Sequence, residues 1–183
     1  MKTTLEMYCQ YLLSSQTNYT CTNLSENIDN LDENSVYRFL KNNKLTPKLI
    51  RDKAKENVIW SENGYLLFDD TVINKNHSFK IEGVKKQYSG NAHGLVKGIA
   101  LISCIYYNPE EDKFWLIDYR IYDPEVDGLD KLGHMQDILR HNISPYSTVL
   151  MDTATMDMMK LIVELGKIFY CPIKIDWLMT LVK

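Results

Sequence analysis

The stretches GYLLFDDT, residues 64–71, and YSTVLMDT, residues 146–153, decide the fold of the larger part of this chain. Each is an apolar run typical of a buried strand, and we expect the strands to end at Asp70 and Asp152. A charged carboxylate in such a place is costly unless it is paired or bound to a metal ion. Either aspartate taken by itself is explained as a turn or helix-cap residue. Together, each followed by Thr, they indicate a catalytic pair that holds divalent cations.

Length and composition restrict the class of protein. With 183 residues the chain can form one domain and a small appendage, and its net charge of -3 limits any nucleic-acid surface to a local patch. The four cysteines lie far apart without a C-x-x-C pair, which argues against a zinc knuckle or a redox motif and indicates reduced thiols. No signal peptide is visible, and no apolar run approaches the roughly 20 residues of a membrane span. We therefore expect a cytoplasmic protein without membrane contact.

Residues 1–60 are expected to form a small helical DNA-binding domain. Short amphipathic helices are predicted near residues 5–13, after Thr22 or Asn23, from Asp32, and from Pro47 to about Glu56. The segment TNLSENIDNLDENSVYRFLKNN has the size of a helix-turn-helix. Between residues 38 and 55 there are seven basic residues and one acidic residue. The alternative is an ordinary solvated helix face. The basic residues predicted to bind DNA phosphates here are Arg38, Lys41, Lys44, Lys48 and Arg51.

Residues 61–183 are expected to form a mixed α/β sheet with flanking helices. The pattern predicts strands at 65–69, 96–107, 114–122, 149–151 and 167–171, and helices at 130–140 and 155–165. Residues 71–94 are predicted to be a long polar connection, which in a compact domain tends to be functional. This order of elements is the ribonuclease H-like arrangement. Its first and fourth strands are neighbours, so Asp70 and Asp152 would lie side by side.

The chain resembles the DDE insertion-sequence transposases of bacteria. The resemblance rests on YLLSSQTNYTCTNLSENID and VYRFL, then LLFDDT, the segment His93–Ile99, and VLMDT followed by LGKIFYCPIK. It implies that Asp70 and Asp152 are the first and second catalytic aspartates, with Asp69 as a neighbour. The implied cofactor is Mg²⁺ or Mn²⁺, because two such ions stabilise the attacking and leaving oxygens when DNA phosphodiesters are cleaved and joined. The implied partner is the double-stranded DNA of transposon ends, bound by a homo-oligomer or together with a full-length transposase.

Further lysines are then expected to face DNA. They are Lys97 and the lysines of the long polar connection, Lys75, Lys80, Lys85 and Lys86. The alternative for all five is that they only keep the surface soluble.

The sequence also departs from the family. The third acidic ligand, a Glu in a Y-x-x-R-x-x-x-E setting, has no counterpart after Asp152: Glu164 is expected to face solvent, and Asp176 matches only one spacing. We therefore expect a catalytic domain that is incomplete at its C-terminus, in a truncated element. Ala154 and Thr155 replace the aromatic residues that commonly follow the second Asp.

Three functions remain open. The chain could be a transposase that needs the missing Glu from another polypeptide. It could be a non-catalytic DNA-binding remnant or regulator of a full-length transposase. It could also be an unrelated metal-dependent phosphohydrolase or a plain α/β domain, in which the paired aspartates are a coincidence.

Overall fold

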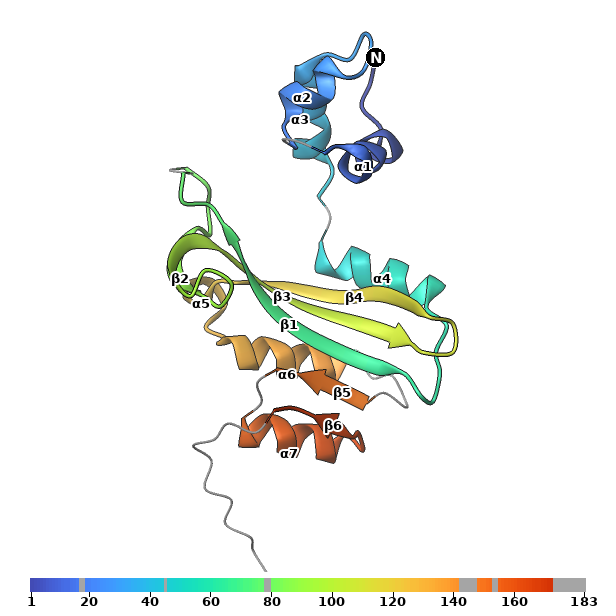
Figure 1. Cartoon of the computed structure of the whole chain (residues 1–183), viewed down its shortest axis with the longest axis vertical. Helices are drawn as coiled ribbons and strands as arrows, with labels where there is room; N and C mark the ends of the chain where they lie inside the picture. The colour runs from blue at the N-terminus through green and yellow to red at the C-terminus, as the bar shows by residue number, and fades with distance from the viewer. Residues whose placement is uncertain (17–18, 45, 78–79, 142–147, 153–154, 173–183) are drawn as a thin grey trace, which may run out of the picture. The chain divides into compact units, whose positions relative to one another are not determined.

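A computed structural model describes residues 1–172 apart from 17–18, 45, 78–79, 142–147 and 153–154. The chain forms two compact units, Met1–Thr46 and Pro47–Lys183, which Figure 1 shows in blue and in cyan to red. Each unit has its own core.

The described secondary structure of the first unit consists of helices joined by turns and loops. It contains α1 (Leu5–Ser14), α2 (Cys21–Glu26) and α3 (Glu33–Asn42). Asn30, with φ of 58°, lies in the turn between α2 and α3. The buried side chains of its core are those of Tyr11, Leu24, Leu31 and Val36. Three of the four helices expected within residues 1–60 lie in this unit, which ends at Thr46.

The start of α2 differs from the expectation. The hydroxyl of Thr20, and not a side chain at position 22 or 23, caps the helix by accepting the Asn23 N–H at 3.0 Å. Tyr11 reinforces this end, because its hydroxyl donates to the Asn23 side chain at 2.7 Å. The cap thus lies two to three residues earlier than the caps predicted at Thr22 or Asn23.

The described residues of the second unit form a six-stranded mixed sheet. Its strands are β1 (Tyr65–Asn74), β2 (Lys85–Ser89), β3 (Gly94–Asn108), β4 (Lys113–Tyr122), β5 (Thr148–Met151) and β6 (Phe169–Tyr170). Its helices are α4 (Pro47–Asn57), α5 (Pro124–Asp127), α6 (Lys131–His141) and α7 (Met156–Glu164). The strands lie in the order β2-β3-β1-β5-β6, with β4 also paired to β3. The β3 pairs are antiparallel, whereas β5 runs parallel to both β1 and β6. The expected ribonuclease H-like mixed α/β fold is confirmed.

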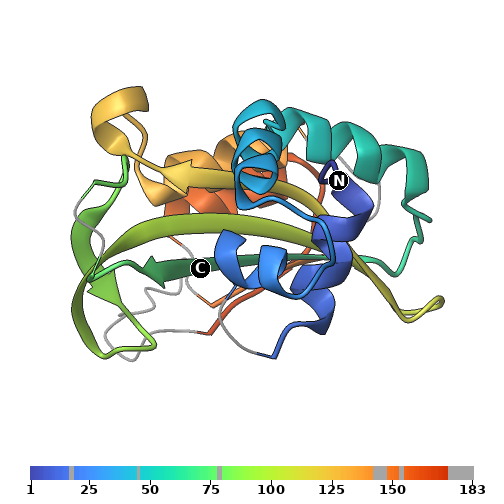
Figure 2. The ribbon, with the colours of Figure 1, turned by 90° about the horizontal axis from the view of Figure 1, so that it is seen from above.

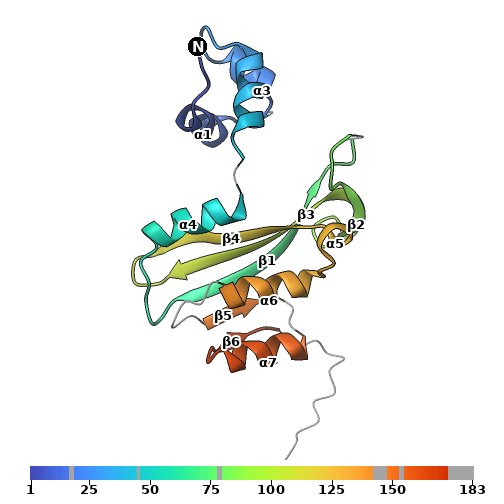
Figure 3. The ribbon, with the colours of Figure 1, turned by 180° about the vertical axis from the view of Figure 1, so that it is seen from behind.

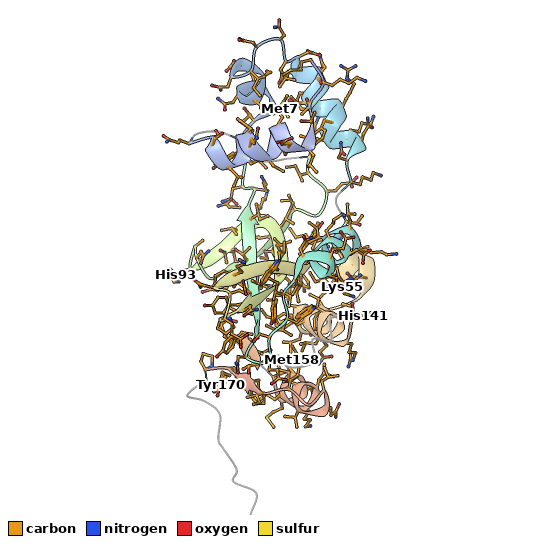
Figure 4. The ribbon with its side chains drawn as sticks, turned by 90° about the vertical axis from the view of Figure 1, so that its right-hand side faces the viewer. Met7, Lys55, His93, His141, Met158 and Tyr170 are labelled. Carbon is orange, nitrogen blue, oxygen red and sulfur yellow. The ribbon has the colours of Figure 1, made fainter. Side chains whose placement is uncertain are left out.

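Helices α4, α6 and α7 cover one face of this sheet, as Figures 2 and 3 show. The residues of β3 alternate strictly, so that every second side chain, such as Ile102 and Cys104, is buried on the helix side. Met158 of α7 is fully buried in the same core (Figure 4). On the opposite face the β3 residues Leu101 and Ile105 are only half-buried, and no described helix of this unit covers them.

Helix α4 belongs to this sheet, although the sequence analysis grouped it with residues 1–60. Ala54 is buried in the core of the second unit, and Val58 packs against it. The guanidinium of Arg51 lies 3.4 Å from the fully buried carboxylate of Asp118 on β4. That carboxylate also contacts Arg120 at 2.5 Å, and Arg120 continues to Asp137 of α6 at 3.1 Å. This network joins α4, β4 and α6.

Two predictions about the strands are wrong. β1 does not end at Asp70 but continues to Asn74, because it pairs with β3 as far as Asn74 opposite Gly98. The polar connection at 71–94 contains a further strand, β2, whose residues Lys85–Ser89 pair with β3. Its sequence KKQYS lacks the apolar alternation by which the other strands were found.

Candidate functional site

Asp70 and Asp152 line the same cleft at one edge of the paired strands β1 and β5. The last parallel pair of these strands is Phe68 with Met151. Asp152 directly follows that pair on β5 and is exposed, whereas Asp70 lies two residues beyond it within β1 and is half-buried. The cleft has a volume of about 440 Å³. Its described lining is Asp69, Asp70, Thr71, Val72, Gln87, Tyr88, Ser89, Gly90, Asn91, Tyr122, Lys131 and Asp152.

Strand alternation separates the two adjacent aspartates of β1. Asp70 shares the helix-side face with Leu66 and Phe68, which are buried, so its carboxylate is directed to the side on which α6 packs. Asp69 lies on the opposite face and is exposed. The backbone carbonyl of Asp69 accepts a hydrogen bond from the Ser103 hydroxyl at 3.4 Å. Asp70 is therefore the β1 carboxylate held closest to the protein core.

The carboxylate of Asp70 forms an ion pair with the ammonium of Lys131, the first residue of α6. Both side chains are about one-third exposed, at 31% and 32%. The ammonium also lies 5.9 Å from the centre of the Tyr122 ring, within cation–π range. The cleft thus already places a positive charge beside Asp70.

The donor set of this cleft fits a hard divalent cation. Mg²⁺ prefers oxygen ligands and keeps several waters, so one or two carboxylates with substrate phosphate can hold each ion. Asp70 and Asp152 supply such oxygens, and Asp69 adds a third carboxylate to the lining. Among the described residues, however, no three His, Cys, Asp or Glu side chains are close enough together to hold a metal ion by themselves.

The basic residues predicted to bind DNA occupy different environments. In the first unit Lys41 and Lys44 are exposed, and Arg38 is exposed with Asp32 at 3.7 Å. In the second unit Lys48 on α4 and Lys97 on β3 are exposed.

Arg51 differs from these residues because its charge is used within the protein, against Asp118. Lys85 lies in the segment that was predicted to be a polar connection, and its charge is also used within the protein. Its ammonium contacts Asp123 at 2.6 Å and Glu125 at 2.8 Å, beside α5. These contacts raise the pKa of Lys85 and lower that of Asp123.

Several residues of the cleft were not predicted from the sequence. Lys131 and Tyr122 reach it from α6 and the end of β4, and Gln87, Tyr88 and Ser89 reach it from the unpredicted strand β2. The only signal for Lys131 was a basic residue at the start of a predicted helix. Glu164 is exposed on α7, as expected, and Asp176 lies outside the described residues.

Neither a protein-family model nor a curated protein matches this chain. Three similar solved structures are a Drosophila P element transposase strand transfer complex, a Mos1 transposase paired-end complex with the left transposon end, and a Mos1 mariner paired-end complex with Mn. Their identities to this chain are 14%, 13% and 12%, and their TM-scores are 0.47, 0.32 and 0.25.

The alignments cover 90–91% of this chain but only 37%, 56% and 58% of the three transposase chains. This chain therefore spans at most 58% of the length of these three transposase chains. At these scores the likeness adds no argument about the site, and the ribonuclease H-like assignment rests on the strand order itself.

No helix in the described part of the chain is long and apolar enough to span a membrane.

Proposed function

We propose that this chain is a transposase-like protein of the DDE superfamily, of the bacterial insertion-sequence type. It binds transposon-end DNA and holds divalent cations at Asp70 and Asp152 for phosphodiester cleavage and joining. The observation that carries the proposal is the meeting of these two aspartates, 82 positions apart, from adjacent parallel strands in one open cleft. Mg²⁺ or Mn²⁺ would supply Lewis-acid stabilisation of the attacking and leaving oxygens. The chain's own residues would position those ions and the DNA strand.

DNA binding is assigned first to the exposed basic residues of the first unit. Lys41 and Lys44 are exposed near the end of the α3 segment, where the C-terminal end of the helix already favours basic side chains. That preference means that their positions do not by themselves require DNA. The support comes from the excess of basic residues after residue 38 and from the resemblance described above.

DNA binding is tested with the full chain and duplexes taken from the DNA that flanks its gene. Replacing Lys41 and Lys44 with Gln should lower both the affinity and its salt dependence, since each lost phosphate contact removes about 0.9 from the slope of log K against log salt. Lys113→Gln, in the exposed hairpin between β3 and β4, is the matched control and should leave both unchanged. Unchanged binding by the double variant would contradict a DNA surface on the first unit.

Strand cleavage is tested in the same mixtures with Mn²⁺ added. We expect cation binding without cleavage, because the described lining of the cleft offers no counterpart of the family's third acidic residue on a C-terminal helix. Cleavage would then need a further acidic residue from outside the described lining. Specific nicking that is lost in Asp152→Asn would overturn this expectation and establish that this chain cleaves DNA itself.

The second candidate function is a DNA-binding regulator that lacks catalysis. The absence of any three metal-ligating side chains that meet within the described residues favours it. Under this alternative the flanking DNA is bound, whereas Mn²⁺ binding does not depend on Asp70 or Asp152. Cation binding that is lost in both Asp70→Asn and Asp152→Asn would exclude it in favour of the first proposal.

A further inference from the structure

Lys131 is the only cationic side chain in the described lining of the cleft, which it shares with Asp69, Asp70 and Asp152. The described lining therefore holds three carboxylates and one ammonium. Lys131 Nζ contacts Asp70 Oδ2 directly, although the two residues are 61 positions apart in sequence. This pair joins the first turn of α6 to the middle of β1.

The position of Lys131 on its helix is electrostatically unfavourable without such a partner. The N-terminal end of a helix carries partial positive charge, so a lysine in the first turn is disfavoured by the helix itself. Helix α6 is firmly seated, since Met135, Ile138 and Leu139 are buried in the core of the second unit. The packing of α6 thus fixes the backbone of Lys131 beside the cleft. Only the end of its side chain can change its contacts.

The ammonium can leave Asp70 without a backbone movement. Its side chain is 32% exposed, and a lysine has four rotatable carbons between Cα and the charge. The Tyr122 ring, 5.9 Å from Nζ, provides a second favourable surface for the same charge. Lys131 now contacts Oδ2 of Asp70, so a divalent cation that binds this carboxylate comes close to the ammonium, and the two positive charges repel each other. Both cations therefore compete for Asp70.

We propose that Lys131 is the resident counter-ion of this cleft, that a divalent cation displaces it from Asp70, and that the released ammonium then binds a phosphate oxygen of the DNA strand. The inference rests on the proposed function. A lysine ammonium is a compact point charge suited to phosphate oxygens. In this exchange the protein keeps a positive charge at Asp70 when no cation is bound, and gains a DNA contact once the cation has taken its place.

The alternative is a purely structural ion pair that fastens α6 to β1. A structural pair would affect stability when broken, but not in a way that depends on Mn²⁺. The proposed exchange predicts two results that a structural ion pair does not. Removing the lysine charge must strengthen cation binding, and it must weaken DNA binding only when the cation is present.

The test compares the full chain with Lys131→Met, which removes the charge but keeps an unbranched apolar side chain, and with Lys131→Arg, which keeps the charge. Lys160→Met, at an exposed lysine of α7, is the control. Mn²⁺ affinity is measured from the loss of the electron paramagnetic resonance signal of free Mn²⁺. Lys131→Met should bind Mn²⁺ roughly five- to tenfold more tightly, because it removes a competing charge at contact distance. Lys131→Arg and Lys160→Met should remain within twofold of wild type.

The second arm measures duplex DNA binding with and without Mn²⁺. With Mn²⁺, Lys131→Met should bind DNA more weakly, and the slope of log K against log salt should fall by about one phosphate contact. Without Mn²⁺, it should bind as wild type does. If Lys131→Met does not fold, Lys131→Gln replaces it in both arms.

The failures of the inference and of the proposed function are distinguishable. Asp70-dependent Mn²⁺ binding that is equally tight in wild type and Lys131→Met would overturn the exchange and leave the proposed function standing. A DNA-binding deficit of the same size with and without Mn²⁺ would also overturn it. Mn²⁺ binding that is the same in wild type and Asp70→Asn would overturn both.

Discussion

The buried carboxylate of Asp118 should be one of the most sensitive positions of the second unit. Its side chain is fully buried, and the two guanidiniums that neutralise it, Arg51 and Arg120, are each only 18% exposed. Asp118→Asn preserves the size of the side chain and one oxygen acceptor, but removes the charge. Arg120 then retains Asp137 at 3.1 Å, whereas no other carboxylate is in salt-bridge contact with Arg51 in the described part of the chain.

Removing one partner of a buried ion pair typically costs 3–5 kcal/mol. Since both arginines keep some contact with water, we expect the lower end, about 3 kcal/mol. For a unit of this size that corresponds to a fall in Tm of roughly 6–12 °C. Helix α4 should loosen first, because the contact between Arg51 and Asp118 links it to β4.

The assay is urea unfolding of the full chain followed by tryptophan fluorescence, together with amide hydrogen exchange over residues 47–57. Asp52→Asn is the matched control, because Asp52 lies next to Arg51 on α4 but is exposed to solvent. It should change the free energy of unfolding by less than about 0.5 kcal/mol. A loss below about 1 kcal/mol for Asp118→Asn, or unchanged exchange in α4, would refute the conclusion that this network holds α4 on the sheet.

Two further predictions concern titratable groups. Burial raises the pKa of the Cys104 thiol above its usual range, so a thiol reagent should label the exposed Cys9 rapidly and Cys104 only after unfolding. Mass spectrometry of the labelled peptides measures both labelling rates. Equal rates would contradict the core position of Cys104. The pKa of Asp123 is lowered by Lys85, so this pair stabilises the fold above pH 3.8, the ordinary value for Asp, and loses that effect as the pH falls through the lower folded-state value. The Tm difference between wild type and Lys85→Met should therefore be constant from pH 5 to 8 and shrink below about pH 4, whereas a difference that grows in acid would have the wrong sign.

The sheet could be predicted where strand sequence and burial agree. LLF in β1 and TVLM in β5 are apolar because these neighbouring central strands contribute to the core, so their pattern located both strands, although it ended β1 too early. Their pairing was predicted from the order of the elements. β2 could not be found in this way. Its side chains at Lys85, Lys86 and Gln87 are polar because the strand lies at the edge of the sheet, where half of its surface meets solvent.

The candidate site was only half predictable for a related reason. Asp70 and Asp152 stood out because they interrupt or follow apolar strands. Lys131 did not, because its partner lies 61 positions away and no spacing rule connects them. The charge of Arg51 was likewise read as part of a basic surface, whereas its partner Asp118 lies 67 positions further along the chain. Tertiary contacts decide which charges remain available to a ligand.

The central claim is that Asp70 and Asp152 hold a divalent cation in one cleft, and Asp152→Asn tests it most directly. Asp152 is exposed, so the substitution should change the metal-free stability by less than about 0.5 kcal/mol. Asp70→Asn is a less specific test of cation binding, because it also breaks the ion pair with Lys131. The measurement is the Tm of the full chain with and without Mn²⁺. At a hundred times its Kd, Mn²⁺ should stabilise wild type by about 2.7 kcal/mol and leave the Tm of Asp152→Asn nearly unchanged. An equal rise in Tm for both proteins, or no rise in wild type, would contradict the account.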